Sequence, residues 1–157
     1  MPFKLFDVSI RQLDDNENIP YDLLLLADPS KEMIDRYVAQ SKVFVATLNL
    51  NIIGTLVLFP VSAHAAEIKN IAVKGEFQGK GVGKLLLDFA IETARKENYS
   101  SICIATANSS VGQLHLYQTK EFEVTGMIKN FFLDNYPEPI YEKGIQAKHL
   151  IVLTRNL

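Results

Sequence analysis

Three glycines stand close together near the middle of the chain, at Gly79, Gly81 and Gly83, just before a long segment with helical periodicity. The first amides of a helix have no internal partner and carry partial positive charge. Glycine at this place removes the Cβ atoms that would keep an anion away from those amides. The spacing therefore predicts a phosphate or pyrophosphate site formed by main-chain amides, with Lys80 and Lys84 adding positive charge nearby.

Two common phosphate-binding motifs do not fit this segment. Dinucleotide-binding folds carry G-x-G-x-x-G directly after a strand, whereas here the spacing is G-x-G-x-G and a loop separates Gly81 from the preceding strand. A P-loop carries G-x-x-x-x-G-K-[ST], whereas Gln78 stands where the first glycine is needed and Leu85 follows Lys84. A nucleotide-dependent enzyme that binds ATP or NAD is therefore disfavoured.

A third pattern, Q/R-x-x-G-x-G/A, is matched without a gap by Gln78, Gly81 and Gly83. On these residues the chain resembles the GNAT superfamily of N-acetyltransferases. The resemblance runs from about Ile68 to Val124, through a strand, the glycine loop, a helix, a strand, an asparagine, a short helix and a tyrosine. It implies an acyl-CoA-dependent N-acyltransferase that uses acetyl-CoA as co-substrate.

The resemblance also implies which residues bind acetyl-CoA. Members of the family open the sheet between the strand before the glycine loop and the next strand, and the pantetheine arm lies in that opening. By similarity, the main chain of Ile71, Ala72 and Val73 binds this arm. Asn108 lies where a family side chain commonly bonds the same arm, and a helix N-cap is its alternative role. The implied pyrophosphate site consists of Gln78, Gly79, Lys80, Gly81, Val82, Gly83 and Lys84.

Tyr117 lies in the segment LYQTKEFE, which resembles the family segment L-Y-x-K-x-G-F-E. The family tyrosine donates a proton to the departing thiolate, and a leaving thiol with a pKa of about 8.5 benefits from such a donor. A packed aromatic with its hydroxyl at the surface is the alternative role for Tyr117. The chain carries Glu121 where the family usually has glycine, which predicts an altered turn before the next strand.

Glu67 begins the strand before the glycine loop. In the histone-modifying branch of the superfamily, a glutamate at this place acts as general base, often through water. An alkylamine has a pKa of about 10.4 and must lose a proton before it attacks, so the resemblance makes Glu67 the candidate base; a solvated charge is the alternative. Direct attack is expected, with amides near Val73 stabilising the oxyanion, because the only thiol, Cys103, lies in a segment typical of a buried strand.

Hydrophobic periodicity predicts the elements that position these residues. The clearest helix begins at Val82, and its apolar positions form one stripe: Val82, Leu85, Leu86, Phe89, Ala90 and Ala94. Further helices are expected at 20–27, from the N-cap Ser30 onward, and after 108–110. Strands are expected at 3–10, 42–48, 52–59, 67–73, 101–107, 121–133 and 148–154, with a loop at 134–144.

Hairpins combined with one β-α-β crossover predict a mixed sheet flanked by helices. With the resemblance, the expected fold is α/β (α+β): a GNAT-like, mostly antiparallel sheet of six to seven strands, splayed between the fourth and fifth strands. A length of 157 residues predicts one N-acetyltransferase domain over residues 1–157.

Composition excludes several classes of protein. A single cysteine forms no internal disulfide, and three histidines far apart in sequence (His64, His115 and His149) disfavour a zinc site, so no metal is expected. A net charge of -2 without a basic block disfavours nucleic acid. No signal peptide or apolar run long enough for a bilayer is visible, so a cytoplasmic location without membrane contact is expected.

The acceptor pocket is expected to form from residues 20–40 and 134–146. Acidic and aromatic side chains there could receive a cation or line a slot: Asp22, Asp28, Asp134, Glu138, Glu142, Tyr21, Phe131, Phe132, Tyr136 and Tyr141. The segment YPEPIY loosely resembles small-molecule acetyltransferases, which favours a small amine, although a peptide amine stays open. A CoA-binding sensor without turnover is the alternative to an enzyme, and the chain could be a monomer or a homodimer.

Overall fold

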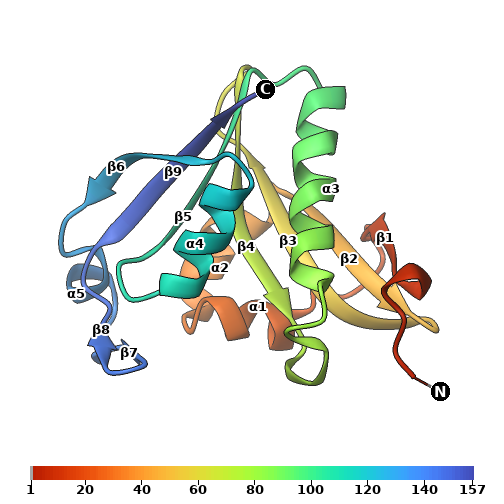
Figure 1. Cartoon of the computed structure of the whole chain (residues 1–157), viewed down its shortest axis with the longest axis horizontal. Coiled ribbons are helices and arrows are strands. Elements are labelled where there is room, and N and C mark those ends of the chain that lie inside the picture. The colour runs from red at the N-terminus through yellow and green to blue at the C-terminus, as the bar shows by residue number, and fades with distance from the viewer. Residues whose placement is uncertain (1) are drawn as a thin grey trace.

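One mixed sheet forms the frame of the molecule, and the computed structural model describes residues 2–157 (Figure 1). Its strand order is β1-β2-β3-β4-β5-β9-β6, and only β4 and β5 run parallel. The strands are β1 (Ser9–Gln12), β2 (Lys42–Leu48), β3 (Asn51–Pro60), β4 (Ala65–Val73), β5 (Ser101–Ala107), β6 (Glu123–Ile128) and β9 (Leu150–Asn156). A separate hairpin pairs β7 (Tyr141–Glu142) with β8 (Ile145–Gln146). This arrangement confirms the predicted fold class.

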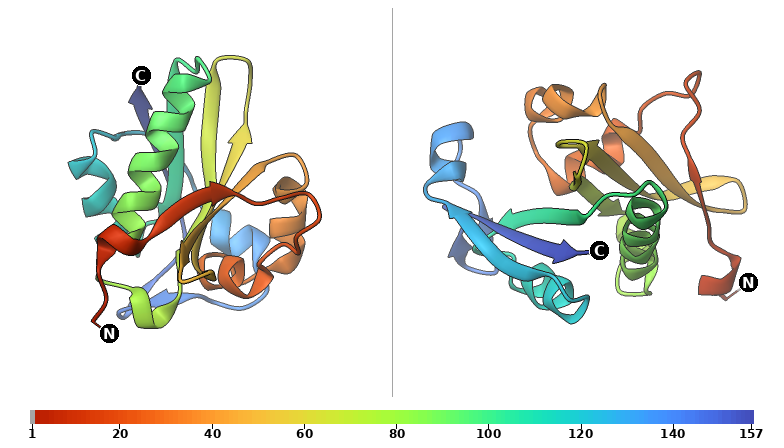
Figure 2. Two further views of the ribbon diagram at one scale, coloured as in Figure 1. Left: turned by 90° about the vertical axis from the view of Figure 1, so that its right-hand side faces the viewer. Right: turned by 90° about the horizontal axis from the view of Figure 1, so that it is seen from above.

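Helices cover both faces of the sheet (Figure 2). On one face, α3 (Val82–Lys96) and α4 (Val111–Thr119) bury the larger core, in which Leu86 of α3 packs with Leu56 and Ile104. On the other face, α1 (Tyr21–Ala27) and α2 (Lys31–Val38) bury a smaller core around Leu24 and Val57. The described residues also form α5 (Phe131–Asn135) and the 3-10 turns η1 (Leu5–Asp7) and η2 (Gly75–Phe77).

β4 and β5 part halfway along their length. They pair from Ala65↔Ser101 to Ile68↔Ile104, and no pairing continues beyond that point. Figure 1 shows the two strands running together near the top of the view and diverging below. The predicted splay between the fourth and fifth strands is therefore confirmed, and it leaves the second half of β4 with an unpaired edge.

A β-bulge lies in β4 where the two strands part. Leu58 of β3 pairs with Ile68, but the next residue back, Val57, pairs with Asn70, so Lys69 is the additional residue. Ile68 packs in the larger core, whereas the Asn70 side chain is buried on the α1 and α2 face. A bulge re-aims the side chains that follow it, and here it falls at the apex of the opening.

The predicted strand at 3–10 is wrong over most of its length. The structure has the turn η1 at Leu5–Asp7, and β1 begins only at Ser9. The Phe6 side chain is 97% exposed. Apolar residues with β propensity need a neighbouring strand edge, and β2 provides one only from Ser9 onward.

The predicted strand at 121–133 and the predicted loop at 134–144 also differ from the structure. β6 ends at Ile128, and Asn130 then takes a left-handed conformation (φ 60°) that turns the chain into α5. The rings of Phe132 and Tyr136 stack with centroids 5.5 Å apart, which fixes this turn. β7 lies within the predicted loop and forms a short hairpin with β8, which directly follows that loop.

Glu121 occupies the position where glycine is usual, and its backbone is left-handed (φ 65°). Arg155 holds this turn: its guanidinium lies 3.0 Å from Glu121 Oε2 and donates to the Lys120 carbonyl at 2.9 Å. The following Phe122 is buried and its ring lies 6.3 Å from that of Tyr117. Glu121 thus adopts a conformation that favours glycine, at the cost of backbone strain.

The strain at Glu121 predicts that two substitutions at this position differ in their free energy of unfolding. We expect Glu121→Gly to be more stable than Glu121→Ala by about 1 kcal/mol, because both lose the ion pair but only alanine keeps the left-handed strain. Urea unfolding of both variants measures the difference. Equal stability, or a more stable alanine variant, would show that the turn carries no strain.

Candidate active site

The glycine loop joins η2 to α3 in a conformation that favours glycine. Gly79 and Gly81 have φ of 73° and 93°, and Gly81 is the N-cap of α3. Within residues 2–157, the amides of residues 79–84 donate no hydrogen bond, and the first that does is Leu85, to the Gly81 carbonyl at 3.1 Å. A continuous run of free donors therefore lies at the positive end of the 15-residue helix α3.

The unpaired edge of β4 supplies further main-chain groups. The Lys74 amide donates to the Ile53 carbonyl at 2.8 Å. Since hydrogen-bonded pairs alternate in an antiparallel ladder, Ala72 also directs its main chain toward β3, whereas Ile71 and Val73 face the opening. The Gln78 side chain donates to the Val73 carbonyl at 2.9 Å, so Gln78 fastens the glycine loop to the end of β4.

A cavity of about 670 Å³ fills the space between the diverging strands. Its volume falls within the usual range for ligand sites, roughly 300–1,000 Å³. Its walls include residues from β4, the glycine loop, β5 and α4: Ile71, Ala72, Val73, Gln78, Gly83, Ala105, Thr106, Leu116 and Tyr117. The loop amides and the free edge of β4 thus belong to one site.

Tyr117 lies on the α4 side of this cavity, and its side chain is 4% exposed. Its hydroxyl makes no hydrogen bond to any other of the described residues 2–157. Burial raises the pKa of Tyr117 to about 12. The hydroxyl therefore keeps its proton at neutral pH, as a proton donor must.

A second cavity, of about 230 Å³, adjoins the first on the α1 and α2 side. The two share wall residues, among them Ile68, Lys69, Thr106, Ser110, Ile140 and Glu142. Three carboxylates, from Asp28, Glu67 and Glu142, and the rings of Tyr37 and Tyr136 line the smaller one. The site is therefore a pair of connected chambers, one bordered by main-chain donors and the other rich in acidic and aromatic groups.

Glu67 lies in the smaller chamber, with its Oε1 atom 3.1 Å from the Lys69 ammonium. Cys103 is its neighbour across the β4–β5 pairing. Burial, followed by the charge of Glu67, raises the pKa of the Cys103 thiol to about 11. The thiol is therefore not ionised at neutral pH, which disfavours a covalent acyl-cysteine route.

Asn108 lines neither cavity, and its side chain bonds to main chain at residues 146–149, with one Nδ2 hydrogen left without a protein partner within residues 2–157. Its Oδ1 accepts from the amides of Lys148 and His149 at 2.8 and 2.9 Å, and its Nδ2 donates to the Gln146 carbonyl at 3.1 Å. The N-cap position of α4 is Ser110, so Asn108 is not the helix cap either. Asn108 instead fastens the end of β5 to the segment between β8 and β9.

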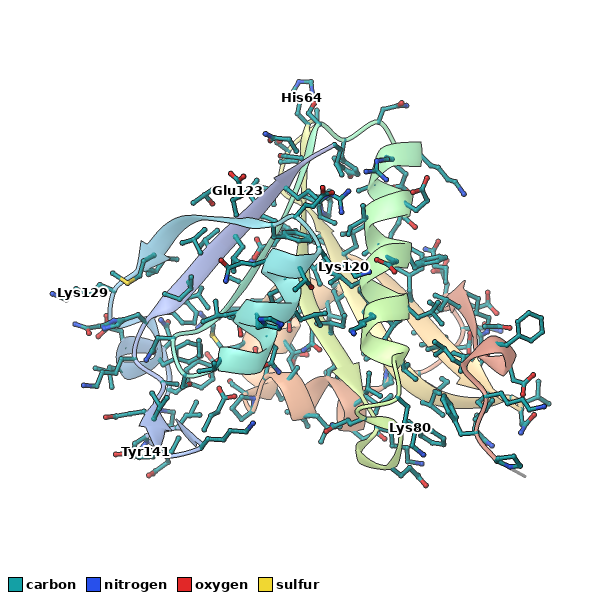
Figure 3. All side chains as sticks on the ribbon, in the orientation of Figure 1. His64, Lys80, Lys120, Glu123, Lys129 and Tyr141 are labelled. Carbon is teal, nitrogen blue, oxygen red and sulfur yellow. The ribbon has the colours of Figure 1, made fainter. Side chains whose placement is uncertain are left out.

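The two lysines of the glycine loop differ in their surroundings. Lys80 Nζ lies 5.3 Å from the ring centroid of Phe3 and 5.9 Å from that of Phe77, whereas Lys84 is exposed on α3. In Figure 3, Lys80 lies below α3, across the opening from Tyr141 on the β7–β8 hairpin. The Lys80 charge is therefore held beside the loop by aromatic rings.

Sequence reasoning missed the contacts that enclose the smaller chamber. The hydroxyls of Ser109 and Ser110 donate to Glu142 Oε1 at 3.1 and 2.7 Å. The Tyr136 hydroxyl donates to Asp28 Oδ1 at 2.8 Å, and burial, reinforced by this bond, raises the pKa of Tyr136. The sequence had indicated Asp28, Tyr136 and Glu142 as candidates for an acceptor pocket, and all three line the smaller chamber, but it did not predict their hydrogen bonds. For the segment Asn108-Ser109-Ser110 it indicated only a helix cap.

Residues 2–157 contain neither a metal-binding cluster nor a helix that could span a membrane. No group of three or more histidine, cysteine, aspartate or glutamate side chains is placed to hold a metal ion. No helix in the same range is long and apolar enough to cross a membrane.

Comparisons with known proteins place the chain in a family. A model of the acetyltransferase (GNAT) family matches residues 10–122. Uncharacterized N-acetyltransferase YvbK of Bacillus subtilis (strain 168) is 43% identical over 137 residues, which are 87% of this chain and 88% of that protein. A GNAT family acetyltransferase from Elizabethkingia anophelis, crystallised with acetyl-CoA bound, has a TM-score of 0.94 and 48% identity over 96% of this chain and 99% of that one. IAA acetyltransferase from Bacillus cereus ATCC 14579 has a TM-score of 0.92 and 41% identity over the same shares.

The chain therefore belongs to the acetyltransferase (GNAT) family. It is an acetyl-CoA-dependent N-acetyltransferase, and this confirms the enzyme class and the co-substrate that the glycine loop predicts. The individual binding and catalytic roles of the residues described above stay predictions.

A substitution in the glycine loop is expected to weaken CoA binding without impairing folding. We expect Gly83→Ala to weaken CoA binding by about tenfold, because a methyl group would narrow the cavity in front of the free amides. A Cβ at Gly83 would come no closer than 3.9 Å to Val73, and alanine favours a helix over glycine, so the variant should fold. Titration calorimetry with CoA and urea unfolding measure the two effects.

Gly112→Ala is the matched control for this experiment. Gly112 lies in the first turn of α4, and a Cβ there would meet no atom within 4 Å. The control should bind CoA like the wild type. Wild-type affinity in Gly83→Ala would show that the first turn of α3 does not contact the pyrophosphate.

Proposed function

We propose that the chain acetylates a primary amine of a small molecule by direct attack of the amine on acetyl-CoA. The observation that carries the proposal is the pair of connected chambers, one bordered by free main-chain donors and Tyr117, the other by carboxylates and aromatic rings. The two substrates would enter from opposite sides and meet where β4 and β5 part.

In this proposal the larger chamber holds acetyl-CoA. The amides of residues 79–84 would bind the pyrophosphate, since they are free and lie at a helix N-terminus. Ile71 and Val73 would bind the pantetheine arm through the unpaired edge of β4, in the manner of an added strand. Ala72 would contribute only its side of the cavity wall, because its main chain pairs with Thr55.

Two side chains would move protons. Glu67 would accept a proton from the incoming ammonium, since it lies in the acceptor chamber. Tyr117 would donate its proton to the departing thiolate, since it lies in the CoA chamber with a protonated hydroxyl. A free Val73 amide at the open edge of β4 would stabilise the oxyanion formed by the attack.

The acceptor chamber supports a small acceptor in preference to a peptide. It has a volume of only about 230 Å³, and α5 and the β7–β8 segment bound it through Phe131, Tyr136 and Glu142. Its carboxylates and aromatic faces suit a cationic amine. The Bacillus cereus neighbour, which is 41% identical, is named for IAA and not for a protein acceptor.

An acceptor screen tests this proposal. Purified protein is incubated with acetyl-CoA and, separately, with small mono- and polyamines, amino sugars, and peptides that carry a free N-terminus or lysine; free thiol and product mass are measured. We expect amine-dependent thiol release with small amines. Release with peptides alone would overturn the small-molecule assignment, and tight CoA binding without any amine-dependent release would indicate a sensor.

The proton-donor role of Tyr117 makes a second prediction. We expect Tyr117→Phe to lower kcat by about 10²-fold without changing the affinity for acetyl-CoA, because only the departing thiolate would use the hydroxyl. The fold should persist, since that hydroxyl makes no hydrogen bond within residues 2–157. Steady-state kinetics measures both quantities.

Tyr99→Phe is the control for the loss of a hydroxyl elsewhere. Tyr99 packs at the edge of the larger core and lines neither chamber. Its variant should keep the wild-type kcat. A wild-type kcat in Tyr117→Phe would leave Tyr117 as a packing residue.

A further inference from the structure

Lys69 has no role in the proposed transfer of the acetyl group to an acceptor. It is the additional residue of the β4 bulge, directly after the last paired residue Ile68. It lines both the larger and the smaller chamber. Its side chain is 32% exposed, and its ammonium lies 3.1 Å from Glu67 Oε1 and 5.5 Å from the ring centroid of Phe59.

This placement is the one that an acceptor amine needs. The amine must lie beside a proton acceptor on one side and reach the thioester on the other, and Lys69 is a primary alkylamine that already contacts Glu67. A lysine stem is flexible, and its ammonium can move within the connected chambers. Lys69 therefore stands in the acceptor chamber as an internal substitute for the acceptor.

We propose that Lys69 is a self-acetylation site, modified by the acetyl-CoA that the protein itself binds when no acceptor is present. This inference rests on the proposed function, since it uses the same chambers and the same Glu67. Glu67 takes a proton from the Lys69 ammonium, and the Nζ lone pair forms a bond to the carbonyl carbon while the carbon–sulfur bond breaks. The products are an Nε-acetyl-lysine, the thiol of CoA and one proton released to solvent.

The modification would change the acceptor chamber in two ways. It removes the positive charge that pairs with Glu67 at 3.1 Å, so that carboxylate loses its partner. It also places an acetamide group beside a chamber of about 230 Å³, where it competes with the acceptor for space. An acceptor at saturating concentration should in turn protect Lys69.

The chain offers a matched control lysine. Each of the two lysines forms an ion pair with a glutamate two residues away. The Lys69 ammonium lies 3.1 Å from the Glu67 carboxylate, and the Lys74 ammonium lies 3.4 Å from the Glu76 carboxylate. Lys74 lines neither chamber, and its side chain is 54% exposed. Chemical acetylation of exposed lysines by acetyl-CoA in solution should therefore favour Lys74, whereas self-acetylation should favour Lys69.

Peptide mass spectrometry of the full chain after incubation with acetyl-CoA alone tests the proposal. We expect Lys69 to gain an acetyl group at least about tenfold faster than Lys74, because a bound donor and a neighbouring amine react as one molecule. The rate should not depend on protein concentration. Glu67→Gln should slow the reaction at Lys69 and leave Lys74 unchanged, and Lys69→Arg should show no acetyl group at position 69.

Several outcomes would overturn the inference. Equal rates at Lys69 and Lys74, or a Lys69 rate that rises with protein concentration, would show acetylation from solution or between molecules. An unmodified Lys69 in protein that still releases thiol with small amines would refute self-acetylation alone. An unmodified Lys69 together with no amine-dependent release would refute both this inference and the proposed function, whereas acetylated Lys69 without release would refute only the acceptor assignment.

Discussion

The site depends on one constraint: β4 and β5 stop pairing at Ile68 and Ile104, which leaves the main chain of Ile71 and Val73 facing the opening. Of these groups, the Val73 carbonyl accepts a hydrogen bond from the Gln78 side chain. Buried main-chain donors and acceptors are nearly always satisfied. The free edge at Ile71 and Val73 borders the same cavity as the free amides of residues 79–84. An extended ligand that ends in an anion would satisfy these groups, and a pantetheine arm joined to a pyrophosphate has this shape.

The β4 bulge lies at residues that line both chambers. Before it, Ile68 packs in the core beneath α3, and after it, Asn70 is buried on the opposite face, where its Nδ2 donates to the Leu24 carbonyl and the Tyr37 hydroxyl. Burial raises the pKa of Tyr37 to about 12, so this contact stays uncharged at neutral pH. One additional residue in a strand therefore sets which side chains pack beneath α3 and which are buried against α1 and α2.

Residue type and short-range spacing predicted the features of the structure that depend on neighbours in the sequence. The glycine loop before α3, the helix from Val82 and the Ser30 N-cap follow from residue type and short-range spacing. The bulge at Lys69, the Asn108 contacts and the closure of the acceptor chamber depend on partners far away in sequence, which no periodicity reveals. The strand predictions at 3–10 and 121–133 were wrong because β propensity does not say whether a neighbouring edge is available.

The chain segment that borders the smaller chamber is attached to both sides of the opening. Its ties run to α4 and β5 through Glu142 and Asn108, and to the end of α1 through Tyr136 and Asp28. None of these bonds reaches the glycine loop. Variation in residues 130–149 can therefore reshape the smaller chamber without breaking a hydrogen bond to the glycine loop, provided that the partners at Asp28, Asn108 and Ser110 are kept.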